Sequence, residues 1–151
     1  MRSAAEMAEW IQNESKMVDE LSGRLCKAAA CIPTENLSGW LDDLRGQFER
    51  FRAHYQKHMA LEEGGGCLAP VLEQWPELTG EVEHLRSEHR EIGVLMKAIY
   101  DELCDLSPDQ PLTMLDCCRR IRNLMEIINH HTDRENLILS LAFSRDVGTS
   151  D

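Results

Sequence analysis

The sequence lacks the features of a β-protein, a secreted protein or a nucleic-acid-binding protein. Strand-like alternation of polar and apolar residues is essentially absent along its 151 residues. The formal net charge of −11 argues against nucleic acid as a main partner, because binding to phosphates needs a basic surface. Residues 1–10 lack the pattern of a signal peptide, and no window approaches the length of a membrane span. We therefore expect a cytoplasmic protein that does not bind membranes.

The cysteines do not form a recognisable zinc or disulfide pattern. No CxxC pair occurs, and the adjacent Cys117 and Cys118 suit neither a usual zinc pair nor an easy disulfide. We expect reduced thiols that act mainly as small hydrophobic residues. Cys67, beside a glycine run, is the candidate for redox reactivity.

What the sequence does contain is helical periodicity. Apolar residues recur at steps of three and four in four long stretches, and the breaks between them carry proline or glycine. The predicted helices cover residues 4–29, 37–63, 79–103 and a last stretch from the break at 107–111 to residue 143. A connector at 67–76 holds one short turn around Val71 and Leu72. This predicts an all-α, up-down-up-down antiparallel four-helix bundle that forms a single domain over residues 1–151.

Histidines and carboxylates interrupt these apolar seams. His58 and Glu62 continue the seam of the second helix, His89 lies in the third, and His131 and Glu135 lie in the fourth. In an antiparallel bundle all five fall at the same end of the core. Buried imidazoles and carboxylates are costly unless something such as a metal ion satisfies them, so the pattern predicts a metal site.

The HxxxE spacing occurs twice, in His58–Glu62 and in His131–Glu135. Residues four apart lie on one helical face, so the imidazole and the carboxylate can reach the same ion, or the carboxylate can bridge to a second. Mixed nitrogen and oxygen ligands without cysteine suit iron or manganese better than a structural zinc centre.

Three motifs in order, HMALEE at 58–63, SEH at 87–89 and HTDREN at 131–136, resemble those of the hemerythrin-like, or HHE cation-binding, family. The resemblance covers most of the chain, although HxxxE alone is a weak signal. It implies a non-heme iron centre, usually with two iron ions and an oxygen bridge. It also implies a small-molecule partner, since family roles include binding or sensing dioxygen, iron or nitric oxide, and handling peroxide.

The first helix departs from the family pattern. Ser15 stands where family members usually have a histidine, so the ligand from this helix is open. Glu14, on the core seam, is one candidate for a carboxylate ligand. His54, one turn before His58, is another, and a site with a single metal ion or little metal is the third alternative.

The remaining polar residues near the seams have simpler interpretations. Tyr55 is predicted to be a core residue whose hydroxyl finds a partner near the site. We expect Glu63 and Glu88 to be solvated, and His84 and His130 to lie on the surface. The glycine run at 64–66 needs only a helix-stop explanation, and a mobile lid there is a further hypothesis.

The leading functional hypothesis is a binding or sensing protein with two iron ions. The competing hypothesis is an enzyme that decomposes peroxide or reduces nitric oxide with the same residues. A structural bundle without metal is the third.

Overall fold

The protein is built from helices. The computed structural model describes residues 4–63 and 68–149, and every regular element within these ranges is helical, which confirms the all-α prediction. In chain order the elements are α1 (Ala4–Ala30), α2 (Leu37–Glu63), α3 (Leu68–Gln74), the 3₁₀ helix η1 (Pro76–Leu78), α4 (Thr79–Asp105) and α5 (Pro111–Thr149). The short turn expected around Val71 and Leu72 is α3.

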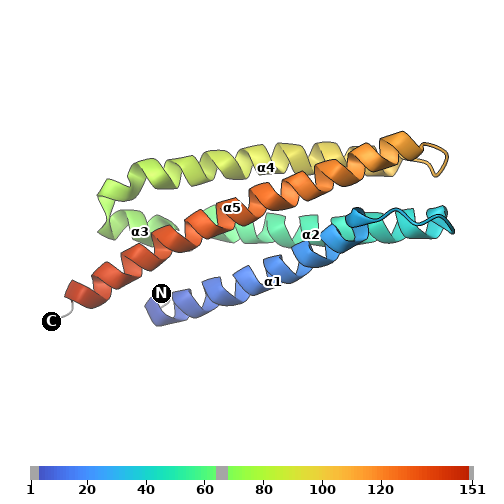
Figure 1. Cartoon of the computed structure of the whole chain (residues 1–151). Coiled ribbons are helices and arrows are strands. Elements are labelled where there is room, and N and C mark those ends of the chain that lie inside the picture. Colours follow the sequence, from blue (N-terminus) through green and yellow to red (C-terminus); the bar gives the residue numbers. More distant parts are fainter. Residues whose placement is uncertain (1–3, 64–67, 150–151) are drawn as a thin grey trace.

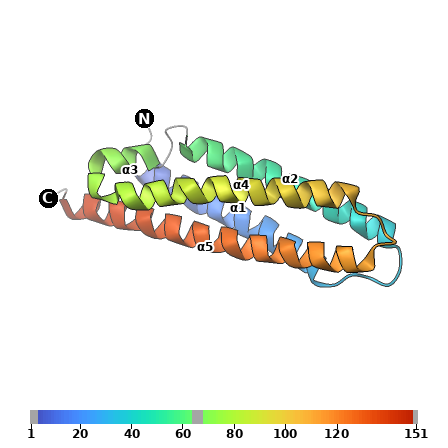
Figure 2. The ribbon, with the colours of Figure 1, turned by 90° about the horizontal axis from the view of Figure 1, so that it is seen from above.

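The four long helices lie lengthwise beside one another, and each runs opposite to the long helix before it (Figure 1). The short α3 packs at the end of the molecule where α2 finishes and α4 begins, and both termini lie at this same end (Figures 1 and 2). Within the described residues no helix has both the length and the apolar composition that crossing a membrane requires.

The helix boundaries follow local signals in the sequence. Pro111 starts α5, where a missing backbone N–H costs nothing, and the preceding turn is held by a hydrogen bond from the Ser107 backbone N–H to Gln110 Oε1 at 3.1 Å. The last helix continues to Thr149 rather than ending at Phe143. The residues after Phe143 include no proline, the residue with by far the largest helix penalty, so the helix can continue. The predictions about Cys67 and the glycines at 64–66 fall outside the described residues.

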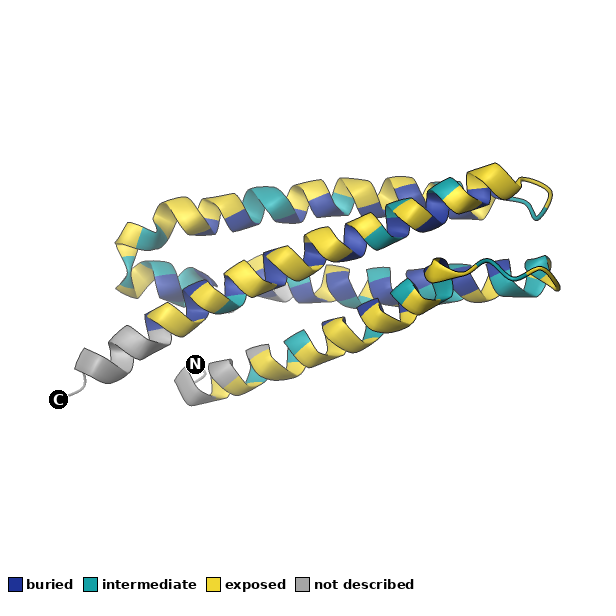
Figure 3. Cartoon of the chain, viewed as in Figure 1, coloured by how far each residue is buried: buried dark blue, intermediate teal, exposed yellow. Residues whose placement is uncertain are grey.

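The buried residues form inward-facing stripes along the helices (Figure 3). The larger apolar cluster draws on all four long helices and includes Phe48, Phe51, Ile92 and Ile128. A smaller cluster lies at the α3 end and consists of Leu68, Val71, Val82, Leu85, Ile138, Leu139 and Ala142. On α4 and α5 the polar residues predicted as ligands lie in sequence between the members of these two clusters. The core is therefore divided by a polar layer.

Candidate metal centre

Five of the predicted ligands meet in this polar layer: His58 and Glu62 from α2, His89 from α4, and His131 and Glu135 from α5. All five are buried, with between 1% and 6% of their surface exposed. Their positions follow from helical register. Leu85 lies one turn before His89 in the smaller cluster, and Ile92 lies one turn after it in the larger one.

The side chains converge on two carboxylates. His58 Nε2 lies 2.5 Å from Glu62 Oε1, and His89 Nε2 lies 3.3 Å from Glu62 Oε2. His131 Nε2 lies 3.3 Å from Glu135 Oε2. Two groups have ligand atoms within 4.8 Å of one another, His58–Glu62–Glu135 and His89–His131–Glu135. Glu135 belongs to both groups, so it lies between two candidate cation positions.

Close approach does not satisfy these atoms. Both oxygens of Glu62, Oε2 of Glu135 and the Nε2 atoms of His89 and His131 are buried and have no hydrogen-bond partner in the described part of the chain. Buried polar groups normally have such partners, and leaving one without costs about 1–3 kcal/mol. Imidazole nitrogens and carboxylate oxygens that face one another suit a cation. The donor set therefore fits a metal ion of the iron or manganese type.

The ionisable side chains in the layer change one another's pKa values. Burial alone would lower the pKa of His58, but the adjacent carboxylates of Glu135 and Glu62 raise it to about 10. The pKa of His89 is raised to about 9 against the same opposition from burial. Burial and the neighbouring Glu135 raise the pKa of Glu62. Burial would also raise the pKa of Glu135, yet its contacts with Glu62 and three imidazoles hold it well below its usual value. Glu135 is thus the permanent anion at the centre.

Two further carboxylates support the histidines from outside the layer. Glu63 Oε1 lies 3.2 Å from His89 Nδ1, and Glu88 Oε1 lies 3.3 Å from His131 Nδ1. The prediction that Glu88 is solvated is wrong, because only 14% of its side chain is exposed. Glu63 is exposed as predicted, although its carboxylate also contacts His89. A histidine that binds a metal through Nε2 normally donates its Nδ1–H to an acceptor. Glu63 follows Glu62 and Glu88 precedes His89 in the sequence, and this adjacency was the signal from which the two acceptors could have been predicted.

Arg134 holds Glu88 in place. Its guanidinium donates to Glu88 Oε2 and lies 3.0 Å from Nε2 of His84, whose side chain is largely exposed as predicted. The series His131–Glu88–Arg134 therefore connects the polar layer to the surface. A charge-assisted hydrogen bond of this kind fixes the carboxylate, and through it the orientation of the imidazole.

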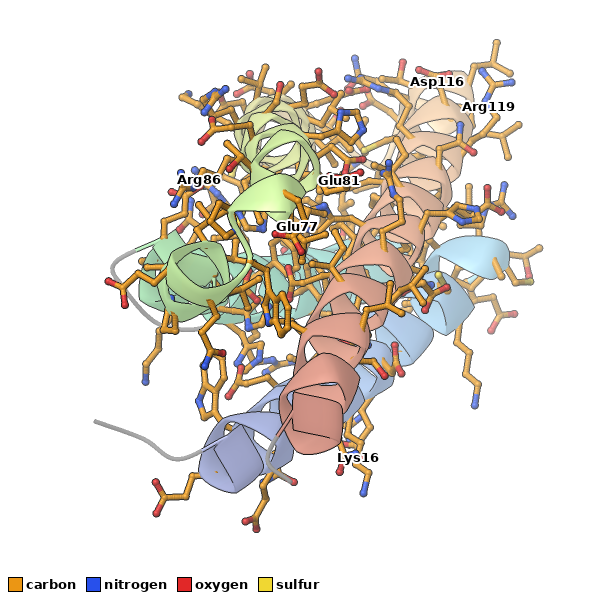
Figure 4. The ribbon with its side chains drawn as sticks, turned by 90° about the vertical axis from the view of Figure 1, so that its left-hand side faces the viewer. Lys16, Glu77, Glu81, Arg86, Asp116 and Arg119 are labelled. Carbon is orange, nitrogen blue, oxygen red and sulfur yellow. The ribbon has the colours of Figure 1, made fainter. Side chains whose placement is uncertain are left out.

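Replacing Arg134 with methionine should therefore weaken metal binding by up to about 10-fold, less than the roughly 10- to 100-fold cost of losing an outer partner outright, because Glu88 itself remains. Isothermal titration calorimetry with Mn²⁺ measures this change. The matched control is Arg119→Met. Arg119 pairs with Asp116 at 2.6 Å on the same helix, and Figure 4 shows both on the outer face of the molecule. Equal affinity in the Arg134 and Arg119 variants would contradict the supporting role of Arg134.

Glu14 and His54 lie behind His58 rather than beside the two central carboxylates. Glu14 Oε2 is 3.4 Å from His54 Nε2 and 3.5 Å from His58 Nδ1, the nitrogen that faces away from Glu62. Neither residue belongs to the two ligand groups described above. Ser15, at the position of the usual histidine, is 3.3 Å from Asn136 and forms a side-chain hydrogen bond with it. The geometry favours Glu14 as an outer partner of His58.

Two aromatic rings flank His58. Trp10 stacks on its imidazole with centroids 5.9 Å apart, a contact that the sequence interpretation missed. Tyr55 lies at the same centroid distance in a tilted arrangement. The partner expected for the Tyr55 hydroxyl is not among the described residues, since this buried oxygen has no hydrogen bond there.

Comparison with known proteins agrees with the motifs. The family described as hemerythrin HHE cation binding domain matches residues 6–141, nearly the whole chain. Neither the comparison with curated proteins nor that with solved structures finds a match. The match includes every residue of the polar layer and its outer carboxylates. The chain belongs to the hemerythrin HHE cation-binding family.

Proposed function

We propose that this protein is a non-heme iron protein whose up-down-up-down bundle holds two iron ions and binds or senses a small ligand such as dioxygen, peroxide or nitric oxide. The observation that supports this most strongly is the set of buried polar atoms with no hydrogen-bond partner in the described part of the chain, contributed to one layer by Glu62, His89, His131 and Glu135. A purely structural helical bundle gains nothing from such atoms in its core, where burying polar groups costs free energy.

In this proposal each residue has a defined role. His58, His89 and His131 would supply nitrogen ligands, and Glu62 and Glu135 would supply carboxylate oxygens that offset part of the cationic charge. Glu63 and Glu88 accept hydrogen bonds from the Nδ1 atoms of His89 and His131, which fixes the ring tautomer so that Nε2 carries the lone pair. Bound iron would supply redox chemistry and positions open to the small ligand. The apolar clusters on both sides of the layer exclude bulk water from it.

Protein produced in iron-supplemented medium should contain about two iron ions per chain, the number that two ligand groups with a shared carboxylate suggest. It should also show charge-transfer absorption in the visible range, and removal of iron with a chelator should lower its melting temperature, because a ligand that binds only the folded state stabilises it. An iron content near zero, with melting unchanged by chelation, would contradict the proposal and favour a purely structural bundle.

Spectra and turnover measured on the same iron-loaded protein distinguish a binding protein from an enzyme. Reversible ligand spectra without turnover indicate a binding or sensing protein. Peroxide turnover that disappears in His89→Ala indicates instead a redox enzyme that uses the same centre. The outer carboxylates and the buried layer are common to both, so only this measurement distinguishes them.

A further inference from the structure

Tyr55 presents a second kind of unsatisfied group to the polar layer. Its side chain is 1% exposed, and its hydroxyl has no hydrogen-bond partner among the described residues. The ring is held by a parallel stack on Phe51 at 5.8 Å and by the tilted contact with His58 at 5.9 Å. A tyrosine hydroxyl that is buried usually finds a partner, so this orphan donor needs an explanation.

Tyr55 lies at the boundary between the larger apolar cluster and the polar layer. Helical register places Tyr55 one turn before His58, Ile92 one turn after His89, and Ile128 one turn before His131. All three are buried members of the larger cluster, and together they form the side of that cluster that faces the layer. Among these three the tyrosine hydroxyl is the polar group, because Ile92 and Ile128 have apolar side chains.

The tyrosine ring borders the polar layer through its contact with His58. A tyrosine hydroxyl carries an O–H donor, and this one donates to neither Glu62 nor Glu135. Its donor therefore remains available to a ligand that enters the layer.

We infer that the Tyr55 hydroxyl donates a hydrogen bond to the small ligand taken up in the polar layer, and that this donor favours anionic ligands, which accept the stronger hydrogen bond, over neutral ones. The inference rests on the proposed iron function and names a specificity-determining residue for it. Tyr55 makes no bond to the cation in this role. Its effect falls on the ligand alone, which separates Tyr55 from the metal ligands experimentally.

The test compares Tyr55→Phe with the wild type in two states of the full-length protein. In the iron-loaded state the probe is azide, a small anion with acceptor nitrogens, titrated through its charge-transfer absorption. We expect Tyr55→Phe to retain the wild-type iron content and to bind azide about 10- to 100-fold more weakly, as for loss of one hydrogen bond to a charged acceptor. The control is Tyr100→Phe. Tyr100 is the second of the two tyrosines, and it stacks on Phe48 with a centroid distance of 6.5 Å.

The metal-free state gives a readout independent of bound iron. Because the hydroxyl has no partner within the described residues, its removal should leave the denaturation midpoint of the metal-free protein equal to or above that of the wild type. A lower midpoint would mean that the hydroxyl stabilises the fold, which overturns the inference. Normal iron content with unchanged azide affinity overturns this inference alone. Absence of iron from the wild type overturns both the inference and the proposed function.

Discussion

Glu135→Gln should lose most of the iron from both positions, the largest functional effect expected of a single substitution in this chain. Glu135 belongs to both ligand groups, whereas Glu62 and each histidine belong to one. Glutamine keeps the shape of the side chain but removes the negative charge that the three imidazoles hold ionised. The loss should exceed the roughly 10- to 100-fold effect of removing an outer partner. Iron content after purification, measured by elemental analysis, tests this.

The matched control is Glu126→Gln, an exposed carboxylate on the same helix. It should keep the wild-type iron content. Circular dichroism of both metal-free variants checks that the helices remain, so that loss of iron is not confused with loss of fold. A Glu135→Gln protein that retains two iron ions would show that the carboxylate does not bridge the two positions, and the ligand assignment would have to be revised.

Metal affinity should depend steeply on pH. In the metal-free protein the pKa values of His58 and His89 are raised to about 10 and about 9, so both imidazoles carry protons at neutral pH. A cation can bind only after these protons leave. If about two protons are displaced, the dissociation constant should fall by roughly 100-fold for each pH unit between about pH 6.5 and 8.5.

The same pKa shifts set the stability of the metal-free protein. The folded-state values lie above the unfolded value of about 6.5 for histidine. The protonated imidazoles therefore stabilise the metal-free fold fully below about pH 6.5, and this contribution disappears as the pH rises through about 9 and 10. Chelation should consequently lower the melting temperature more at high pH than at low pH.

Calorimetry with Mn²⁺, in buffers with different ionisation enthalpies, measures the number of protons released. The wild type should release about two near neutral pH, and His58→Gln should release about one, because its amide carries no displaceable proton. An affinity that does not change between about pH 6.5 and 8.5 would contradict the protonated state of the metal-free layer.

The sequence predicts most of the fold because helix signals are local. Proline at 111 and the spacing of apolar residues locate the helix starts, and the α2 range is predicted to the residue. The end of α5 was predicted too early because a stretch without proline says little about where a helix stops. The meeting of His58, Glu62, His89, His131 and Glu135 also follows from register, since seam residues at the same level in antiparallel helices must face one another.

The outer contacts of the layer were less predictable, because they depend on which neighbouring helix a side chain points toward. Glu88 and His131 are 43 residues apart, and nothing local indicates that the carboxylate turns toward the neighbouring helix. The same holds for Arg134, which reaches from α5 to α4. Glu14 illustrates the limit most clearly: its place on the seam was evident, but its position behind His58 required the packing of α1.

The polar layer between two apolar clusters has a consequence for how the molecule unfolds. The smaller cluster lies at the end of the molecule with α3. On α4 and α5 the imidazoles and carboxylates of the polar layer separate it from the larger cluster. Without a cation, local opening of this end costs only the small cluster. A cation bound to α2, α4 and α5 is a removable cross-link between distant segments, and it makes the two parts open as one cooperative unit.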